Sequence, residues 1–271
     1  MLKVSKRFVD RCKAHLRRYL KLFASAKSRD VNESDTVVII TDFLAEVLGY
    51  DKYTEITTEF SVRSTFCDLA ITIDGDLRYL IEVKSAGTDL KDNHLRQAVD
   101  YAANQGIEGV ILTNGSCWHV HRVHFEQPIR SELVLNLDLL DENRRTAEIV
   151  RDLALLSREA TTTGSMEKYW KQKEATSRFV VGHLLLTESM LRLLRRHIRQ
   201  LSGGVKVTTE HLGELLRTEV LKRDVIEGER SDAAAKLVRK LGRRKVRPSP
   251  PADTEPRTVP STPSPTLKGS A

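Results

Sequence analysis

Two acids and a lysine are the residues of this sequence whose types and spacing could do chemistry. They are Asp68 and the triplet Glu82-Val83-Lys84. Carboxylate oxygens suit Mg²⁺ or Mn²⁺, and Lys84 alone supplies one positive charge against two negative ones. An isolated acid-x-lysine triplet is common on solvent-exposed strands. The interpretation therefore depends on whether the fold places Asp68 beside Glu82.

The alternation of apolar residues predicts a β-hairpin from Cys67 to Ser85. The expected core face carries Cys67, Leu69, Ile71 and Ile73 on the first strand, and Leu77, Tyr79, Ile81 and Val83 on the second. The loop between the two strands could contain two residues or three. A two-residue loop, 74–75, would set Cys67 opposite Glu82, whereas a three-residue loop, 74–76, sets Asp68 opposite Glu82. We predict the three-residue loop, because it keeps both apolar faces on the core side. Paired carboxylates repel each other, which favours a cation between them.

The elements around the hairpin predict an α/β fold of the α+β type, with a mixed sheet flanked by helices. A basic amphipathic helix is expected over 4–23, docked on its own domain rather than on a membrane surface. The other expected elements are a helix over Glu33–Leu48 with Asn32 as N-cap and Gly49 as its end, strands at 54–60, 109–113, 118–125 and 132–137, and helices at 90–104 and near 141–160.

Three further groups of residues are candidates for a site. Glu33 lies in line with the buried stripe of its helix, where N-terminal capping is the simpler interpretation. Gln97 and Tyr101 are one turn apart beside His94, on the face that the helix is expected to present. His119 and His121 share a strand face with Cys117, but neither they nor His124 have the spacing of a complete tetrahedral zinc site.

Charge is distributed unevenly along the 271 residues, whose net charge is +7. Residues 1–30 carry 10 Lys and Arg against 2 Asp and Glu, residues 31–165 carry 12 against 23, and residues 166–247 carry 20 against 10. An acidic centre between basic segments suggests a metal site with arms that bind a polyanion. Three scattered cysteines, no apolar run of membrane length and no secretory signal predict a cytoplasmic protein.

The polar stretch Thr161–Ser165 is the expected domain boundary. It separates a domain over 1–160 from a basic helical accessory domain over 166–247, with helices at 166–186, 188–201, 209–222 and 231–241. One of these helices contains four arginines: Arg192, Arg195, Arg196 and Arg199. A Pro/Ser/Thr-rich tail over 248–271 is expected to be disordered.

In their order along the chain, these residues resemble the PD-(D/E)xK nuclease superfamily, and more closely the N-terminal domain of type I restriction enzyme R subunits. The similarity covers about Val31 to Val123. NESDT places Glu33 at the first-helix acid, Asp68 stands at the "PD" aspartate with Cys67 in place of the proline, and Glu82-Val83-Lys84 matches the E-x-K. Gln97 and Tyr101 match a Q-x-x-x-Y element, and LTNG with Trp118 fits the strand that follows.

The resemblance implies a restriction-endonuclease-like core and metal-dependent phosphodiester hydrolysis. Asp68, Glu82 and the Val83 carbonyl would hold Mg²⁺ or Mn²⁺, Lys84 would act on water and phosphate, and Glu33 would reach a second ion or a ligating water. Gln97 and Tyr101 would contact the substrate. The sequence has no G-x-x-x-x-G-K-[ST] phosphate loop, so we expect no ATP site in this chain.

The resulting hypothesis is a metal-dependent DNA endonuclease or exonuclease without a helicase motor, with RNA not excluded as substrate and with restriction or defence subunits as partners. The main alternative is a non-catalytic or partner-dependent nucleic-acid-binding module on the same fold. A third is a helical scaffold whose basic ends bind RNA. No membrane association is expected.

Overall fold

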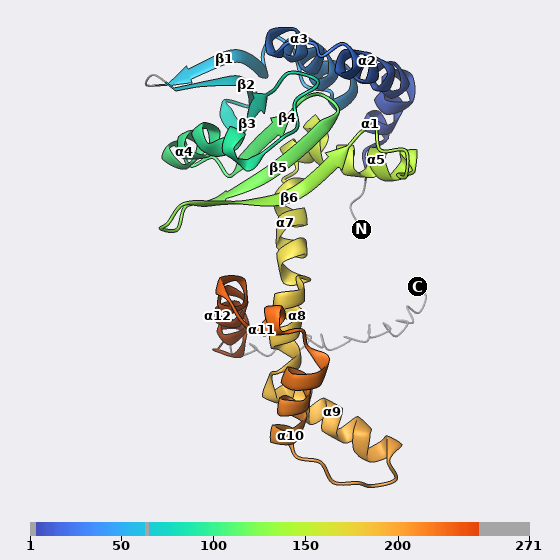
Figure 1. The fold of residues 1–271 in the computed structure, drawn as a ribbon, viewed down its shortest axis with the longest axis vertical. Helices are drawn as coiled ribbons and strands as arrows, with labels where there is room; N and C mark the ends of the chain where they lie inside the picture. Colours follow the sequence, from blue (N-terminus) through green and yellow to red (C-terminus); the bar gives the residue numbers. More distant parts are fainter. Residues whose placement is uncertain (1–3, 63–64, 244–271) are drawn as a thin grey trace, which may run out of the picture. The chain divides into compact units, whose positions relative to one another are not determined.

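The computed structural model describes residues 4–62 and 65–243, which form two compact units, Met1–Thr176 and Ser177–Ala271 (Figure 1). The first unit contains a six-stranded sheet in the order β1-β2-β3-β4-β5-β6. The strands are β1 Ile56–Val62, β2 Thr65–Ile73, β3 Asp76–Val83, β4 Gly109–Thr113, β5 Cys117–His124 and β6 Arg130–Asp138. Only β3 and β4 run parallel, so the expected mixed sheet with helices against it is confirmed.

The turn between β2 and β3 differs from the one predicted. It is a two-residue loop, in which Asp74 (φ 54°) and Gly75 (φ 84°) are both left-handed, as a type I′ hairpin turn requires. Ile73 pairs with Asp76 and Thr72 with Leu77, but a bulge then pairs Ile71 with Tyr79. The extra residue restores the register that burial of the apolar faces demands.

Two side chains expected on the core face lie elsewhere. The sheet packs against two apolar clusters, a larger core that includes Leu69 and Tyr79 and a smaller cluster that includes Leu80. Leu77, which precedes the bulge, and Cys67, which lies next to Asp68, both pack in the smaller cluster. The bulge accounts for Leu77, because it shifts the alternation by one residue. Opposite this part of β2, strand β1 has a left-handed residue, Glu59 (φ 49°). Side chains on β2 do not alternate regularly between the two faces across Asp68, so Cys67 and Leu69 lie in different clusters.

One long N-terminal helix covers the larger core, as predicted. It consists of α1 Lys6–Arg11, a π-helical turn at Cys12–Leu16, and α2 Arg17–Ser28. Its buried stripe contains Phe8, Cys12, Leu16, Tyr19 and Phe23, all at most 5% exposed. The helix is therefore docked on its own unit, because its apolar face is already occupied by the core.

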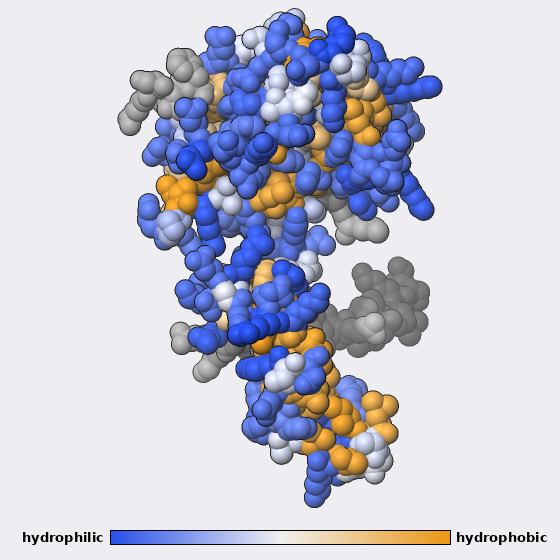
Figure 2. Space-filling view, viewed as in Figure 1, coloured by the Kyte–Doolittle hydropathy of each residue, from blue (hydrophilic) through white to orange (hydrophobic). Residues whose placement is uncertain are grey.

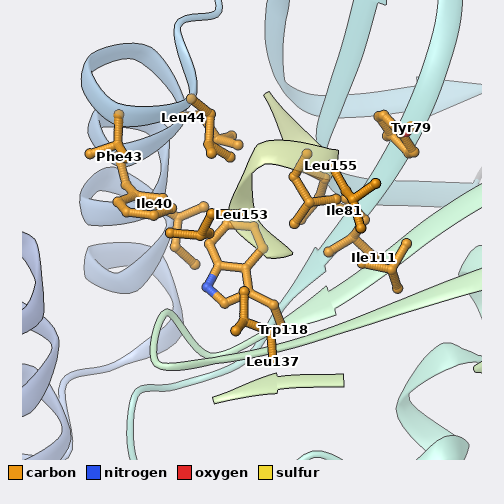
Figure 3. Packing of buried hydrophobic residues seen from close by; sticks show 14 of the residues in the cluster. Ile40, Phe43, Leu44, Tyr79, Ile81, Ile111, Trp118, Leu137, Leu153 and Leu155 are labelled. Carbon is orange, nitrogen blue, oxygen red and sulfur yellow. The ribbon is translucent and has the colours of Figure 1, made fainter. Parts of the chain in front are cut away.

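The second helix also follows the prediction, with α3 at Glu33–Phe43 and a π-helical turn at Leu44–Leu48. The Asn32 side chain accepts a hydrogen bond from the Asp35 amide (2.9 Å), and Gly49 ends the helix with φ 86°. Figure 3 shows Ile40, Phe43 and Leu44 of this helix gathered around Trp118 of β5. The Trp118 ring is fully buried, and its Nε1 donates to the Gly115 carbonyl (2.8 Å).

A third helix of the first unit packs on the smaller cluster. It is α4 Arg96–Gln105, preceded by a 3₁₀ turn at Asp92–Leu95. Its buried side chains include Ala98, Ala102 and Tyr101, and they meet Leu80, Val110 and Leu112 of the central strands. Strand β4, whose sequence GVILT is typical of a strand covered on both faces, is buried throughout.

The boundary expected at 161–165 is wrong, because the chain there continues within the first unit. The elements are α5 Thr146–Leu153, a 3₁₀ turn at Ala154–Leu156, α6 Arg158–Thr162 and α7 Ser165–Ala175. Met166 and Trp170 of α7 are buried in the larger core, at 0% and 4% exposure. Polar composition misled the prediction, since threonines and a glycine here end one short helix and begin another.

Among its described residues, 177–243, the second unit consists of helices joined by turns and loops, with no strand. Its helices are α8 Arg178–Leu185, α9 Glu188–Leu201, α10 Thr209–Leu215 with a π-helical turn at Leu216–Val220, α11 Arg223–Ile226 and α12 Glu229–Arg243. The single helix predicted over 166–186 is divided, because Ser177 caps α8 by accepting from the Val180 amide (3.3 Å). The tail over 248–271 lies outside the described residues. None of the described helices is both long and apolar enough to cross a membrane.

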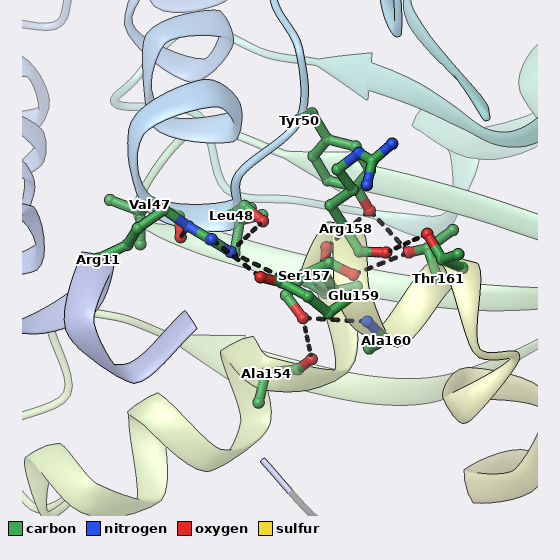
Figure 4. A network of polar contacts seen from close by, with 12 residues as sticks. Arg11, Val47, Leu48, Tyr50, Ala154, Ser157, Arg158, Glu159, Ala160 and Thr161 are labelled. Carbon is green, nitrogen blue, oxygen red and sulfur yellow. Dashed lines mark hydrogen bonds and ion pairs between the residues drawn. The ribbon is translucent and has the colours of Figure 1, made fainter. Parts of the chain in front are cut away.

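A polar network joins α1 to α6 and to the π-helical turn at Leu44–Leu48 (Figure 4). Arg11 makes a two-pronged ion pair with Glu159 (2.9 and 2.7 Å) and also donates to the carbonyls of Val47 and Leu48 (both 3.1 Å). Another residue at Gly49 would be strained by its left-handed φ of 86°, and its Cβ would lie 2.4 Å from the Arg11 guanidinium and displace it. Burial alone would raise the pKa of Glu159, but the hydrogen bonds and charge of Arg11 bring it below its ordinary value.

We expect Arg11→Ala to lower the free energy of unfolding by about 2 kcal/mol, because it removes charged hydrogen bonds from a site that is three-quarters buried. A double-mutant cycle with Glu159→Gln, followed by urea unfolding, measures the coupling. Since the folded-state pKa of Glu159 is depressed, the stabilisation is present at neutral pH and is lost as pH falls below about 4. Additive effects of the two substitutions at pH 7 would contradict the assignment.

Candidate active site

The predicted site residues come from three elements that meet at the end of β3. Lys84, directly after β3, forms an ion pair with Glu82 (2.8 Å between Nζ and Oε1) and another with Glu33 (3.2 Å between Nζ and Oε2). The side chains of Lys84 and Glu82 are only 19% and 15% exposed, whereas that of Glu33 is 47% exposed. Glu33 is thus not only a residue in the first turn of α3, because it also neutralises Lys84.

Asp68 lies on the neighbouring strand, one position beyond the Leu69–Ile81 pair, and Glu82 is the matching position on β3. The Asp68 Oδ2 accepts a short hydrogen bond from the Val83 amide (2.6 Å). This bond fixes the carboxylate against the middle residue of the Glu82-Val83-Lys84 triplet. The structure therefore brings together Glu33, Asp68, Glu82, Val83 and Lys84, the residues that sequence reasoning nominated for the metal and catalytic roles.

Two backbone hydrogen bonds that the sequence did not reveal fix the end of β3. The Ala86 amide donates to the Val31 carbonyl (2.9 Å), which holds the start of α3 there, and the Lys84 amide donates to the Thr113 carbonyl of β4 (2.8 Å). Gly87 packs so closely on Asp30 that a Cβ would lie 2.3 Å from its carboxylate. Gly87, three residues after Lys84, was the one sequence signal for this close packing, but a single glycine is too common to predict it.

Both strand carboxylates have perturbed acidity. Burial raises the pKa of Asp68, and the hydrogen bond from Val83 and the charge of Lys84 only partly offset it. Burial also raises the pKa of Glu82, assisted by the negative charges of Asp68 and Glu33 and opposed by Lys84. Burial would lower the pKa of Lys84, but Glu82 and Glu33 together raise it. The lysine is therefore held in its charged form.

Three carboxylates around one ammonium leave the cluster with an excess of negative charge. Among the described residues, no three His, Cys, Asp or Glu side chains form a group that could enclose a metal ion. Mg²⁺ does not require such a group, because it keeps several waters and binds through one or two carboxylates. Asp68 uses only Oδ2, and Glu82 only Oε1, in hydrogen bonds with described residues, so the second oxygen of each is available. The donor set therefore fits Mg²⁺ or Mn²⁺.

The two residues proposed to contact substrate are not equivalent. Gln97 is exposed on α4. Tyr101 was expected on the presented face, but it is 7% exposed, packs edge-on against Phe60 (6.2 Å between ring centroids), and has a hydroxyl without a partner among the described residues. The expectation for Tyr101 was wrong because its ring fills the space between α4 and β1. Neither residue hydrogen-bonds with Asp68, Glu82 or Lys84.

His119 and His121 of β5 lie with ring centroids 6.4 Å apart, and His124 contacts Glu132 (3.4 Å). Among the described residues, none of the three histidines belongs to a group of three possible metal ligands. Burial lowers the pKa of His121 to about 4, with His119 contributing, so His121 is neutral at pH 7. His119 is two strands from Glu82, through Leu112, on the same cross-sheet row.

Comparison with known proteins identifies no relative of the chain: no family model matches it, and neither does any curated protein or solved structure.

The hydrogen bond between Asp68 and Val83 can be separated from the charge of Asp68. Asp68→Asn keeps an oxygen acceptor for the Val83 amide, so we expect its stability without divalent ions to lie within about 0.5 kcal/mol of the wild type. Asp68→Ala leaves that amide unpaired and should cost about 1–2 kcal/mol. Thermal or urea unfolding in EDTA measures both, and Asp89→Ala, at an exposed position, is the control. Equal losses for the Asn and Ala variants would mean that the hydrogen bond does not stabilise the fold.

Proposed function

We propose that this protein is a Mg²⁺- or Mn²⁺-dependent nuclease that hydrolyses phosphodiester bonds in DNA. The observation that carries the proposal is that three acids meet at the end of one strand: Glu33 and Glu82 form ion pairs with Lys84, and Asp68 accepts a hydrogen bond from the adjacent Val83 amide. The order of these residues also resembles the PD-(D/E)xK superfamily, which supports a restriction-endonuclease-like core and the type I R subunit comparison. A cytoplasmic location and restriction or defence subunits as partners belong to the same proposal.

In this proposal, Asp68, Glu82 and the Val83 carbonyl hold the divalent ion, which supplies Lewis-acid stabilisation of charge on the phosphate. The hydrogen bond from the Val83 amide orients the Asp68 carboxylate before any ligand arrives. Lys84 lies 2.8 Å from Glu82, so it is positioned to orient the attacking water and to offset charge at phosphorus. Glu33 restrains Lys84 from the other side, and Gln97, which is exposed, contacts the substrate backbone.

Magnitudes favour a metal over the side chains alone. General acid–base assistance is worth roughly 10²–10⁴-fold, which is at most about 6 kcal/mol. Enzymes that act on the slowest phosphate-ester hydrolyses supply on the order of 20 kcal/mol. Without a cation, Lys84 and two carboxylates would therefore supply only a small part of the roughly 20 kcal/mol by which such enzymes lower the barrier.

A nucleic-acid-binding module on the same fold is the second candidate. The observation that favours it is that Lys84 is held by ion pairs to two glutamates, Glu82 and Glu33. Catalysis requires the lysine to leave at least one of them for water or phosphate. Removing the Glu33 side chain should therefore change nucleic-acid affinity little in a binding module. In an enzyme, it should change how Lys84 is positioned for cleavage.

The test is cleavage of supercoiled plasmid, linear duplex, single-stranded DNA and RNA, each in Mg²⁺, Mn²⁺ or EDTA. We expect wild-type cleavage of DNA with either metal and none in EDTA. Lys84→Ala should reduce cleavage by at least 10²-fold, whereas Lys21→Ala, which removes an exposed lysine of α2, should not. Gln97→Ala should have a smaller effect than Lys84→Ala.

Metal binding is measured separately, as the shift in unfolding temperature on adding Mg²⁺. At about 100 times the Kd, a single site stabilises the folded state by roughly 2.7 kcal/mol. We expect this shift to persist in Lys84→Ala and to vanish in Asp68→Asn and Glu82→Gln, which lose a ligand charge. If the wild type and Lys84→Ala are equally inert on every substrate yet bind DNA alike, the binding module replaces the nuclease.

A further inference from the structure

The second unit has a groove lined by arginines that the candidate active site does not use. It lies along α9 and the segment that joins α9 to α10, and its volume is about 720 Å³. The residues that line it are Ser189, Arg192, Leu193, Arg195, Arg196, Arg199, Val205, Lys206 and Val207. Five of these nine carry a positive charge and none carries a negative one.

The arginines face the groove because the opposite face of α9 is anchored. Leu191 is 7% exposed and packs with Leu212 and Leu216, and Leu194 and Ile198 join the same cluster. Apolar residues at a spacing of three and four thus fix the rotation of the helix and turn its basic side outward. Figure 2 shows apolar surface among hydrophilic residues over this part of the second unit.

Most of this positive charge is not neutralised within the unit. Arg192 pairs with Glu188 (2.8 Å), and the charge of Arg195 acts on Glu210. Arg196, Arg199 and Lys206 are exposed and form no ion pair with a described residue. A groove that collects like charges without partners is stabilised by an anionic ligand, and the arginine fork matches phosphate oxygens in pairs.

We propose that this groove binds the phosphate backbone of a nucleic acid. Arg192 and Arg199 are seven residues apart, or about 10 Å along the helix, which equals the rise of about three phosphates of one DNA strand along the duplex axis, at roughly 3.4 Å each. Leu193 and Val205, 37% and 57% exposed, offer apolar surface to the sugars. The lining has no aromatic side chain on which a base could stack, so the expected contacts are with phosphates and sugars, which carry no sequence information.

An acidic peptide is the other ligand that such charge could attract. Because the arginine fork matches carboxylates as well as phosphates, it does not decide between the two ligands. The nucleic acid is favoured because the arginines extend over about 10 Å of α9, which suits a backbone of evenly spaced phosphates. The groove is formed by the second unit alone, so the inference holds whether or not Lys84 and its neighbours cleave DNA.

The test compares two double variants of the full chain in EDTA, where cleavage is blocked and only binding is measured. Arg196→Gln/Arg199→Gln removes two unpaired groove charges. Lys236→Gln/Lys240→Gln removes two exposed charges from α12, outside the groove, and is the matched control. The dissociation constant for a fluorescent 20-base-pair duplex is measured by anisotropy at several salt concentrations. Circular dichroism and unfolding temperature establish that both variants are folded.

We expect the groove variant to reduce the slope of log K against log salt by about 1.8, since each neutralised phosphate contributes about 0.9 on duplex DNA. The control should change the slope by less than half as much. Arg196→Lys/Arg199→Lys should retain the slope, because it keeps the charges. Equal slopes for the wild type and the groove variant would overturn the proposal. So would loss of poly-glutamate binding with unchanged DNA binding, which would assign the groove to an acidic peptide.

Discussion

The register between β2 and β3 is the constraint on which the site depends. Leu69 must face the larger core and Ala70 the smaller one, because the centre of the sheet is buried on both sides. A slip by one residue would bury polar groups along a whole strand. The Asp74-Gly75 turn by itself would produce that slip, and the bulge opposite Ile71 and Thr72 removes it. Asp68 lies beside Glu82 as a consequence of burial farther along the hairpin, and not of any attraction between the two acids.

The same burial makes the acid cluster unfavourable in isolation, and its neighbours compensate. A hydrogen bond from Val83 offsets part of the cost of placing Asp68 at a half-buried position, and Lys84 offsets part of the cost for Glu82. Glu33 reaches Lys84 because the backbone bond between Ala86 and Val31 holds the start of α3 against the end of β3. Electrostatic strain of this kind is typical of sites that act on a ligand, since a divalent cation would relieve it.

The two units separate charge in opposite senses. In the first unit, negative charge exceeds positive charge around the end of β3. Elsewhere in that unit, Arg11 and Glu159 neutralise each other in an ion pair. In the second, α9 presents unpaired arginines from an anchored helix. A polyanion with a bound divalent ion is the type of ligand that both surfaces would accept. That shared chemistry links the proposed nuclease site and the proposed backbone-binding groove without requiring contact between them.

The sequence by itself determined the order of elements, the mixed sheet, the N-cap at Asn32 and the grouping of Asp68, Glu82 and Lys84, because these follow from local periodicity and capping chemistry. Only the tertiary structure decided the bulge, the extension of the first unit through Trp170, the burial of Tyr101 and the contact of Glu33 with Lys84. Each of these depends on contacts between residues distant in sequence. An amphipathic side chain such as Tyr101 can satisfy either a surface or a core, and the space left between α4 and β1 decides which.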